Sequence, residues 1–120
     1  MHHPRGYATQ IRERARETVD RVVDCIVRHY DPDRVIVFGS YARGDVHEGS
    51  DLDLLIVKET QARFTDRIGT VMRACDFDTA VEPLVYTPAE LDRMVDQGND
   101  FILAVLKEGK VVYEKRQERR

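Results

Sequence analysis

Val37-Phe38-Gly39-Ser40-Tyr41-Ala42-Arg43-Gly44, followed after a short spacer by Ser50-Asp51-Leu52-Asp53, is the stretch of sequence that decides the fold. The β-branched and aromatic run 34–38 predicts a buried strand, which ends abruptly at Gly39-Ser40. Ser40 is expected to cap a short helix that begins at Tyr41. Residues 51–57 predict a second strand, which begins with two carboxylates and ends fully apolar.

The two carboxylates are the first candidate for chemistry. Asp51 and Asp53 are two positions apart, so on a strand both side chains point to the same face. Their like charges repel unless a cation lies between them, and oxygen ligands of this kind suit Mg²⁺ or Mn²⁺. The alternative is a pair of solvated acids at a strand end, which an Asp-x-Asp pattern alone would favour.

The Gly39-Ser40 turn is the second candidate. A strand that ends in Gly-Ser and turns into a helix offers backbone N–H groups and a hydroxyl to a phosphate. Arg43 can reach a phosphate as well, or it can pair with Asp45 or Glu48. Each feature alone has an ordinary structural explanation, but a phosphate cradle and a metal-binding acid pair in one cleft are the parts of a nucleotidyl-transfer site.

The rest of the chain alternates between helical and strand patterns. Apolar residues every three or four positions predict helices over residues 8–30 and 60–75. A third strand is expected over residues 78–87, and Thr87-Pro88-Ala89-Glu90 is a capping box that opens a helix through Asp96. A last helix ends at Gly109, with an edge strand at residues 111–113. This order predicts an α/β (α+β) fold in one domain, residues 8–114, with flexible termini at 1–7 and 115–120.

Composition narrows the class of protein. The 120 residues are 42% hydrophobic and 34% charged, which suits one soluble globular domain. With 19 basic and 22 acidic residues, the net charge of −3 argues against direct nucleic-acid binding. No apolar run is long enough to cross a bilayer and no signal-peptide pattern opens the chain, so we expect a cytoplasmic protein without membrane contact. Cys25 and Cys75 are interpreted as small buried apolar residues, not as a disulfide framework.

The motif resembles that of a known family. Phe38-Gly39-Ser40 with Asp51-Leu52-Asp53-Leu54 resembles the signature of the DNA polymerase β-type nucleotidyltransferase superfamily. The fuller string, with Tyr41-Ala42-Arg43-Gly44, is similar to the minimal nucleotidyltransferases of bacteria and archaea, and the likeness extends over about residues 10–114. The resemblance implies a small mixed β-sheet flanked by helices. It also implies ATP bound with Mg²⁺ (or Mn²⁺), with Gly39, Ser40 and Arg43 at the nucleotide and Asp51 and Asp53 at the metal.

A third carboxylate usually completes such a site, as a base or metal ligand for the acceptor hydroxyl. The family commonly has Asp before the apolar residues that lead into a Tyr-Thr-Pro segment, and here the register places Glu82 at that position. Asp78 is the alternative, but on a regular strand it would lie about 13 Å from Glu82. Pro83 lacks a ladder donor, which predicts an edge strand or a bulge.

The resemblance also implies a partner. Minimal nucleotidyltransferases are often paired with a HEPN-domain protein, which is the toxin of a toxin–antitoxin pair and can receive AMP on a tyrosine. The first hypothesis is therefore an adenylyltransferase antitoxin with catalytic residues Asp51, Asp53 and Glu82, all three also metal ligands. The alternative is a non-catalytic nucleotide-binding or partner-binding module that neutralises a HEPN toxin by contact. A small-molecule transferase is disfavoured, because 120 residues leave no room for a substrate-holding helical domain.

Overall fold

The computed structural model describes residues 4–116 and folds them into helices and strands in nearly the predicted order. The elements are α1 (Pro4–Tyr30), β1 (Arg34–Phe38), α2 (Ser40–Arg43), β2 (Leu52–Val57), α3 (Phe64–Ala74), β3 (Val81–Tyr86), α4 (Pro88–Asp96), α5 (Asp100–Glu108) and β4 (Lys110–Glu114). None of the helices in this part of the chain combines the length and the apolar character that crossing a bilayer requires.

The four strands form one mixed sheet in the order β3-β2-β1-β4. β2 runs antiparallel to β1 and parallel to β3, and α3 provides the crossover connection that a parallel pair needs. β4 runs antiparallel to β1, with a register shift between Val35 and Ile36. The α/β prediction with a mixed sheet is confirmed. β3 lies at an edge, which explains how a strand accommodates Pro83.

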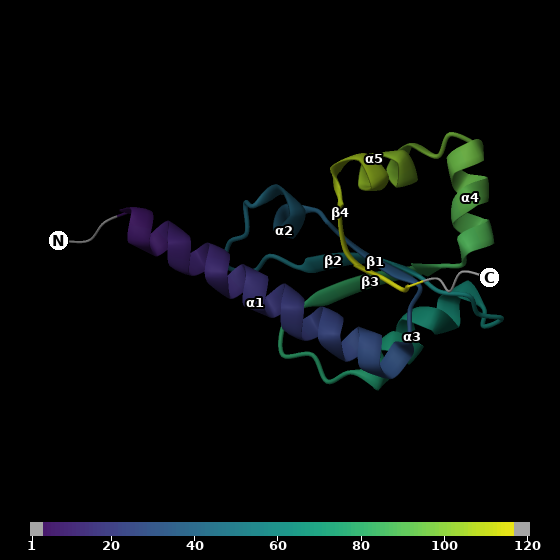
Figure 1. Cartoon of the computed structure of the whole chain (residues 1–120), viewed down its shortest axis with the longest axis horizontal. Coiled ribbons are helices and arrows are strands. Elements are labelled where there is room, and N and C mark those ends of the chain that lie inside the picture. Colours follow the sequence, from purple (N-terminus) through teal and green to yellow (C-terminus); the bar gives the residue numbers. More distant parts are fainter. Residues whose placement is uncertain (1–3, 117–120) are drawn as a thin grey trace.

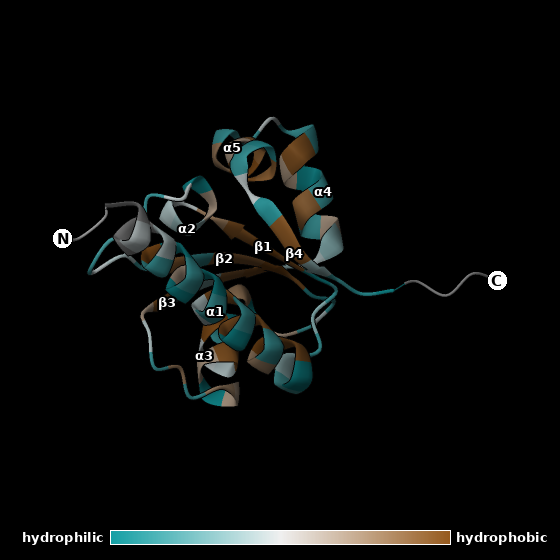
Figure 2. Ribbon diagram, turned by 60° about the vertical axis from the view of Figure 1, so that its left-hand side comes forward, coloured by the Kyte–Doolittle hydropathy of each residue, from teal (hydrophilic) through white to brown (hydrophobic). Residues whose placement is uncertain are grey.

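Helices cover both faces of the sheet (Figure 1). Alternate residues of β2 point to opposite faces: Leu52, Leu54 and Ile56 pack with α1 and α3, whereas Leu55 and Val57 pack with α4 and α5. Figure 2 shows the central strands β1 and β2 in brown, as the most hydrophobic layer, and a largely teal, hydrophilic surface along the visible side of α1. Burial on both faces explains why the end of β2 has a continuous apolar run instead of an alternating one.

Several local boundaries differ from the sequence predictions. α1 begins at Pro4, earlier than the predicted residue 8. Gly39, not Ser40, is the N-cap of α2, and no side chain caps that helix, so the predicted capping role of Ser40 is wrong. At the other end, the Lys115 amide donates to the Asp33 carbonyl oxygen at 2.8 Å, which ties residue 115 to the sheet. The flexible ends expected at 1–3 and 117–120 lie outside the described residues.

The cysteine prediction is wrong in one respect. Cys75 is buried and Cys25 partly buried, as their helical periodicity suggested, but the two are joined in a disulfide. Cys25 is on α1 and Cys75 follows the last residue of α3, and packing of these helices brings their Cα atoms to 6.1 Å, within the usual range for a disulfide. Periodicity shows that each cysteine faces the interior, but it does not show which element lies opposite.

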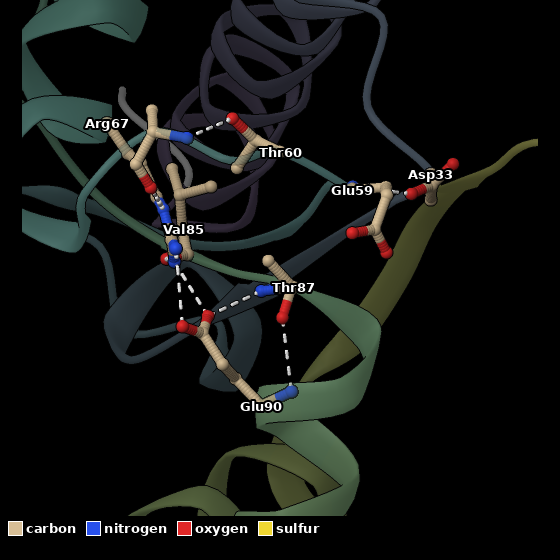
Figure 3. Close-up of polar contacts among 8 residues, drawn as sticks. Asp33, Glu59, Thr60, Arg67, Val85, Thr87 and Glu90 are labelled. Carbon is tan, nitrogen blue, oxygen red and sulfur yellow. Dashed lines mark hydrogen bonds and ion pairs between the residues drawn. The ribbon is translucent and has the colours of Figure 1, made fainter.

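A buried arginine joins α3 to the beginning of α4 (Figure 3). The Arg67 side chain is only 6% exposed and forms a double ion pair with Glu90, at 2.6 Å and 3.2 Å. Arg67 also donates to the carbonyl oxygens of Ala62 and Val85. Glu90 completes the predicted capping box, since it accepts from the Thr87 amide while its own amide donates to the Thr87 hydroxyl. This network holds the end of β3 in place.

We predict that Arg67→Met lowers the free energy of unfolding by about 2–3 kcal/mol, because it leaves Glu90 and two carbonyl groups without their buried partner. Urea denaturation measures the loss. Arg73→Met on the same helix, where the side chain is exposed, is the control and is expected to change stability by less than about 0.5 kcal/mol. Equal effects of the two substitutions would contradict a structural role for the ion pair.

We predict that reduction of the Cys25–Cys75 disulfide lowers stability by roughly 2–4 kcal/mol, because it releases a 50-residue loop of the unfolded chain. Thermal unfolding with and without a phosphine reductant measures this change, and a Cys25→Ala/Cys75→Ala variant is expected to be insensitive to the reductant. Alkylation of both thiols in denatured protein that was never reduced would show that the disulfide does not form.

Candidate active site

The register of the central strands brings together residues that are far apart in the sequence. Asp53 of β2 lies opposite Phe38, the last residue of β1, and on its other side it lies opposite Glu82 of β3. Asp53 and Glu82 therefore occupy neighbouring positions across the parallel pair. The strand predicted over residues 51–57 thus lies beside the strand that ends at Phe38, but it begins at Leu52, so Asp51 precedes it.

The face on which these carboxylates lie follows from the alternation of each strand. Asp53 shares a face with Leu55, and Glu82 shares a face with Leu84. Leu55 and Leu84 belong to the apolar cluster under α4 and α5, so both acids point to that side of the sheet. Glu82 is exposed and Asp53 partly exposed, which leaves them accessible to a ligand.

Gly39 makes the close approach that completes this arrangement. Its φ of 72° lies in the left-handed region, and a Cβ built on it would overlap Asp53 Oδ2. The backbone that turns from β1 into α2 therefore lies directly against the Asp53 carboxylate. The first N–H groups of a helix have no partner within the helix, so the turn offers donors beside a carboxylate that is able to bind a cation.

Asp51 lies just outside β2, at the end of a loop that is held on both sides. The His47 amide donates to the Ser50 hydroxyl, and the Ser50 amide donates to the His47 carbonyl oxygen, both at 2.9 Å. The Leu52 amide donates to the Ala80 carbonyl oxygen at 2.8 Å, which joins this loop to the segment before β3. Asp51 is thus positioned next to both strands that contribute the other two acids.

The charges of neighbouring acids raise the pKa values of Glu82 and Asp53. The negative charges of Asp51 and Asp53 raise the pKa of the Glu82 carboxyl above its ordinary 4.5, and hydrogen bonds to both acids raise it further. Desolvation raises the pKa of Asp53, as does Asp51, whereas the Arg43 charge lowers it. Because protonation relieves this repulsion, a bound cation would relieve it as well.

The structure also shows the contacts of Arg43 and Ser40, two further residues predicted for the site. The Arg43 guanidinium pairs with Asp45 at 3.2 Å, one of the two alternatives that the sequence left open, and it is also close enough to influence Asp53. Ser40 is the first residue of α2, and its carbonyl oxygen accepts from the amides of Gly44 and Asp45. Both lie on the turn beside the carboxylates.

Asp78 lies apart from this cluster. It precedes β3 and pairs with Arg21 of α1 at 3.0 Å, with both side chains largely exposed. The structure thus brings Glu82, not Asp78, beside Asp51 and Asp53.

One residue near the site was not identified from the sequence. Phe101 of α5 packs edge-on against Phe38, with ring centroids 5.7 Å apart, yet it remains 47% exposed. Its apolar spacing indicates only a helix, and the tertiary contact places it beside the strand end that precedes Gly39.

The acids provide oxygen donors, the type that Mg²⁺ and Mn²⁺ prefer. Among the residues that the structure describes, no group of three or more His, Cys, Asp or Glu side chains is arranged to hold a metal ion by itself. Mg²⁺ commonly binds through one or two carboxylates and takes its remaining ligands from substrate phosphates and water. The donor set therefore fits a metal that arrives with a nucleotide.

Comparison with known proteins agrees with the fold. A solved structure of a "putative nucleotidyltransferase" from Sulfolobus solfataricus superimposes with a TM-score of 0.63, at 24% sequence identity, and the match covers 90% of this chain and 87% of that one. At this identity the likeness concerns the fold alone.

The family is shown by sequence. The family model described as "Polymerase beta, Nucleotidyltransferase" matches residues 21–118, and this chain belongs to that family. Two proteins of Methanocaldococcus jannaschii, each named "putative protein adenylyltransferase", are similar to it. One is 32% identical over 73 residues, 58% of this chain and 74% of that protein; the other is 31% identical over 80 residues, 67% and 77% respectively.

We predict that Asp51→Asn stabilises the metal-free protein, and does so more strongly as the pH rises. The raised pKa of Glu82 means that the folded chain holds this proton to higher pH than the unfolded chain, so the wild type loses stability as pH increases from about 4.5 through the folded pKa. Asp51→Asn removes the largest cause of that shift.

Thermal unfolding in a chelating buffer across pH 4–8 measures the difference in Tm between variant and wild type. Asp20→Asn, on the exposed side of α1, is the matched control and is expected to show no such pH-dependent difference. A difference for Asp51→Asn that stays constant with pH would show that the acids do not interact as described.

Proposed function

We propose that this protein transfers AMP from ATP to a hydroxyl group, specifically a tyrosine, of a HEPN-type toxin, and so acts as the antitoxin of the pair. The observation that carries the proposal is the approach of the Gly39 turn to Asp53, with Glu82 directly across the parallel pair. Similarity to proteins named as protein adenylyltransferases supports a protein acceptor.

In the proposed reaction the acceptor oxygen attacks the α-phosphorus of ATP. A bond forms between them, the bond from the α-phosphorus to the bridging oxygen breaks, and pyrophosphate leaves. Asp51 and Asp53 would hold Mg²⁺ or Mn²⁺, which supplies positive charge to the phosphate oxygens when bound. Gly39 and Ser40 would hold the triphosphate through backbone N–H groups and the hydroxyl.

Glu82 is the residue proposed to act on the acceptor hydroxyl. It lies across from Asp53 on an edge strand and is exposed, so an acceptor from outside the chain can reach it. As a base it would take the proton of the attacking hydroxyl, and as a metal ligand it would orient the same group. Arg43 would contribute to phosphate binding once its surface pair with Asp45 opens.

We predict that Glu82→Gln lowers the rate of AMP transfer by about 10²–10⁴-fold while ATP binding is largely kept, because Glu82 acts on the acceptor.

Asp51→Asn and Asp53→Asn are expected to weaken ATP binding measured with Mg²⁺ present, since each removes a charge that the cation needs. Mass spectrometry of a HEPN-domain protein, after incubation with this chain, ATP and Mg²⁺, measures the added AMP, and calorimetry measures ATP affinity.

Asp78→Asn is the matched control and is expected to retain transfer, because Asp78 pairs with Arg21 away from the site. Transfer that survives Glu82→Gln but fails in Asp78→Asn would reverse the two assignments. A HEPN partner that binds tightly and never gains AMP would show that this chain neutralises it by contact alone.

A further inference from the structure

α1 extends well beyond the core that it helps to form. Its 27 residues cover about 40 Å, whereas the six residues of β2 cover about 20 Å. Figure 1 shows the N-terminal part of the helix extending past the end of the sheet. Between residues 9 and 30 of α1, the first buried position is Val22, while Ile11, Ala15 and Val19 of the same apolar stripe are only partly buried. The apolar stripe therefore continues where the core has ended.

The continuation of the stripe forms the floor of a pocket of about 210 Å³ between α1 and the α2 turn. The partly buried side chains of Tyr41 and Val46 face it from α2 and the following loop. A second hollow of about 290 Å³ shares four residues with the first and lies against the same part of α1. These shared residues are Ile11, Ala15, Tyr41 and Val46.

The lining of the first pocket carries positive charge. Arg12 and Arg16 of α1 and Lys110 of β4 line it, all three are exposed, and no acidic residue lines it. Within residues 4–116 none of these three forms an ion pair, whereas other arginines of this range do, as Arg21, Arg34 and Arg67 show. In a chain of net charge −3, this unpaired group is a local positive surface that attracts anions.

We propose that this pocket docks an acidic segment of the acceptor protein, with one apolar side chain inserted between α1 and Tyr41 and its carboxylates on Arg12, Arg16 and Lys110. The shape and the charge together favour a peptide, since an apolar floor with a cationic rim matches an apolar anchor flanked by acids.

The pocket adjoins the proposed nucleotide site through α2, because Tyr41 follows Ser40 and Gly44 follows Arg43. Lys110 likewise pairs with Val37, one residue before the end of β1. A segment docked here would keep the acceptor hydroxyl at high local concentration near the carboxylates, a consequence that rests on the proposed AMP transfer. The docking itself does not depend on catalysis.

Fluorescence anisotropy with a labelled random copolymer of glutamate and tyrosine tests the docking, with a lysine–tyrosine copolymer as the oppositely charged probe. We expect salt-sensitive binding of the acidic probe only. Arg12→Glu/Arg16→Glu is expected to weaken it at least about tenfold, whereas Arg73→Glu/Arg93→Glu, the same charge change at two exposed positions away from the pocket, leaves it nearly unchanged.

Ala15→Trp fills the pocket without changing charge and is expected to weaken binding as well, which separates docking from general attraction between charges. In AMP-transfer assays with the HEPN partner, the pocket variants should raise KM for the acceptor and leave ATP affinity unchanged. Equal weakening by both charge-reversal pairs, no effect of Ala15→Trp, or tighter binding of labelled oligouridylate than of the acidic copolymer would overturn the docking proposal. Intact docking without AMP transfer would overturn the proposed function instead.

Discussion

The arrangement of the site depends on one constraint, the register of β2 between its two neighbours. Asp53 lies opposite Phe38 on one side and opposite Glu82 on the other, so it joins the end of β1 and its turn at Gly39 to the edge strand β3. A shift of one residue in either pairing would turn Asp53 or Glu82 to the other face, where α1 and α3 pack. Four buried leucine and isoleucine side chains on β2 resist such a shift.

The candidate site brings like charges together, whereas the rest of the fold contains a buried pair of opposite charges. Asp51, Asp53 and Glu82 bring like charges together: the charges of Asp51 and Asp53 raise the pKa of Glu82, and desolvation, followed by the charge of Asp51, raises the pKa of Asp53. Beyond the other end of β3, Arg67 and Glu90 form a buried pair in which the hydrogen bond to Arg67 lowers the pKa of Glu90. The repulsion within the acid cluster would be relieved by a bound cation. The Arg67–Glu90 ion pair and the Cys25–Cys75 disulfide stabilise the fold around that cluster.

Local patterns accounted for most of the fold. The apolar run of β1 and the capping box at Thr87 specify short-range geometry, so both were predictable at the correct positions. The N-cap of α2 was misassigned to Ser40: Gly39 takes that position, and it lies so close to Asp53 that a Cβ would overlap the carboxylate, a contact that depends on the tertiary structure. The disulfide was missed for a related reason, since it depends on how α1 and α3 pack across a separation of 50 residues.

The sequence by itself determined the alternation of helices and strands, the acid pair and the turn that precedes it, because these follow from periodicity and residue type within short windows. It left open whether Glu82 or Asp78 joins the acid pair and what Arg43 contacts. The tertiary structure decided the first: parallel pairing sets Glu82 beside Asp53, while Asp78 lies against Arg21. Arg43 forms a local pair with Asp45. The pocket beside Arg12 and Arg16 also depends on tertiary structure, namely on how α1 is placed against the sheet. α1 extends past the end of the sheet, so the N-terminal part of its apolar stripe has no strand to cover it.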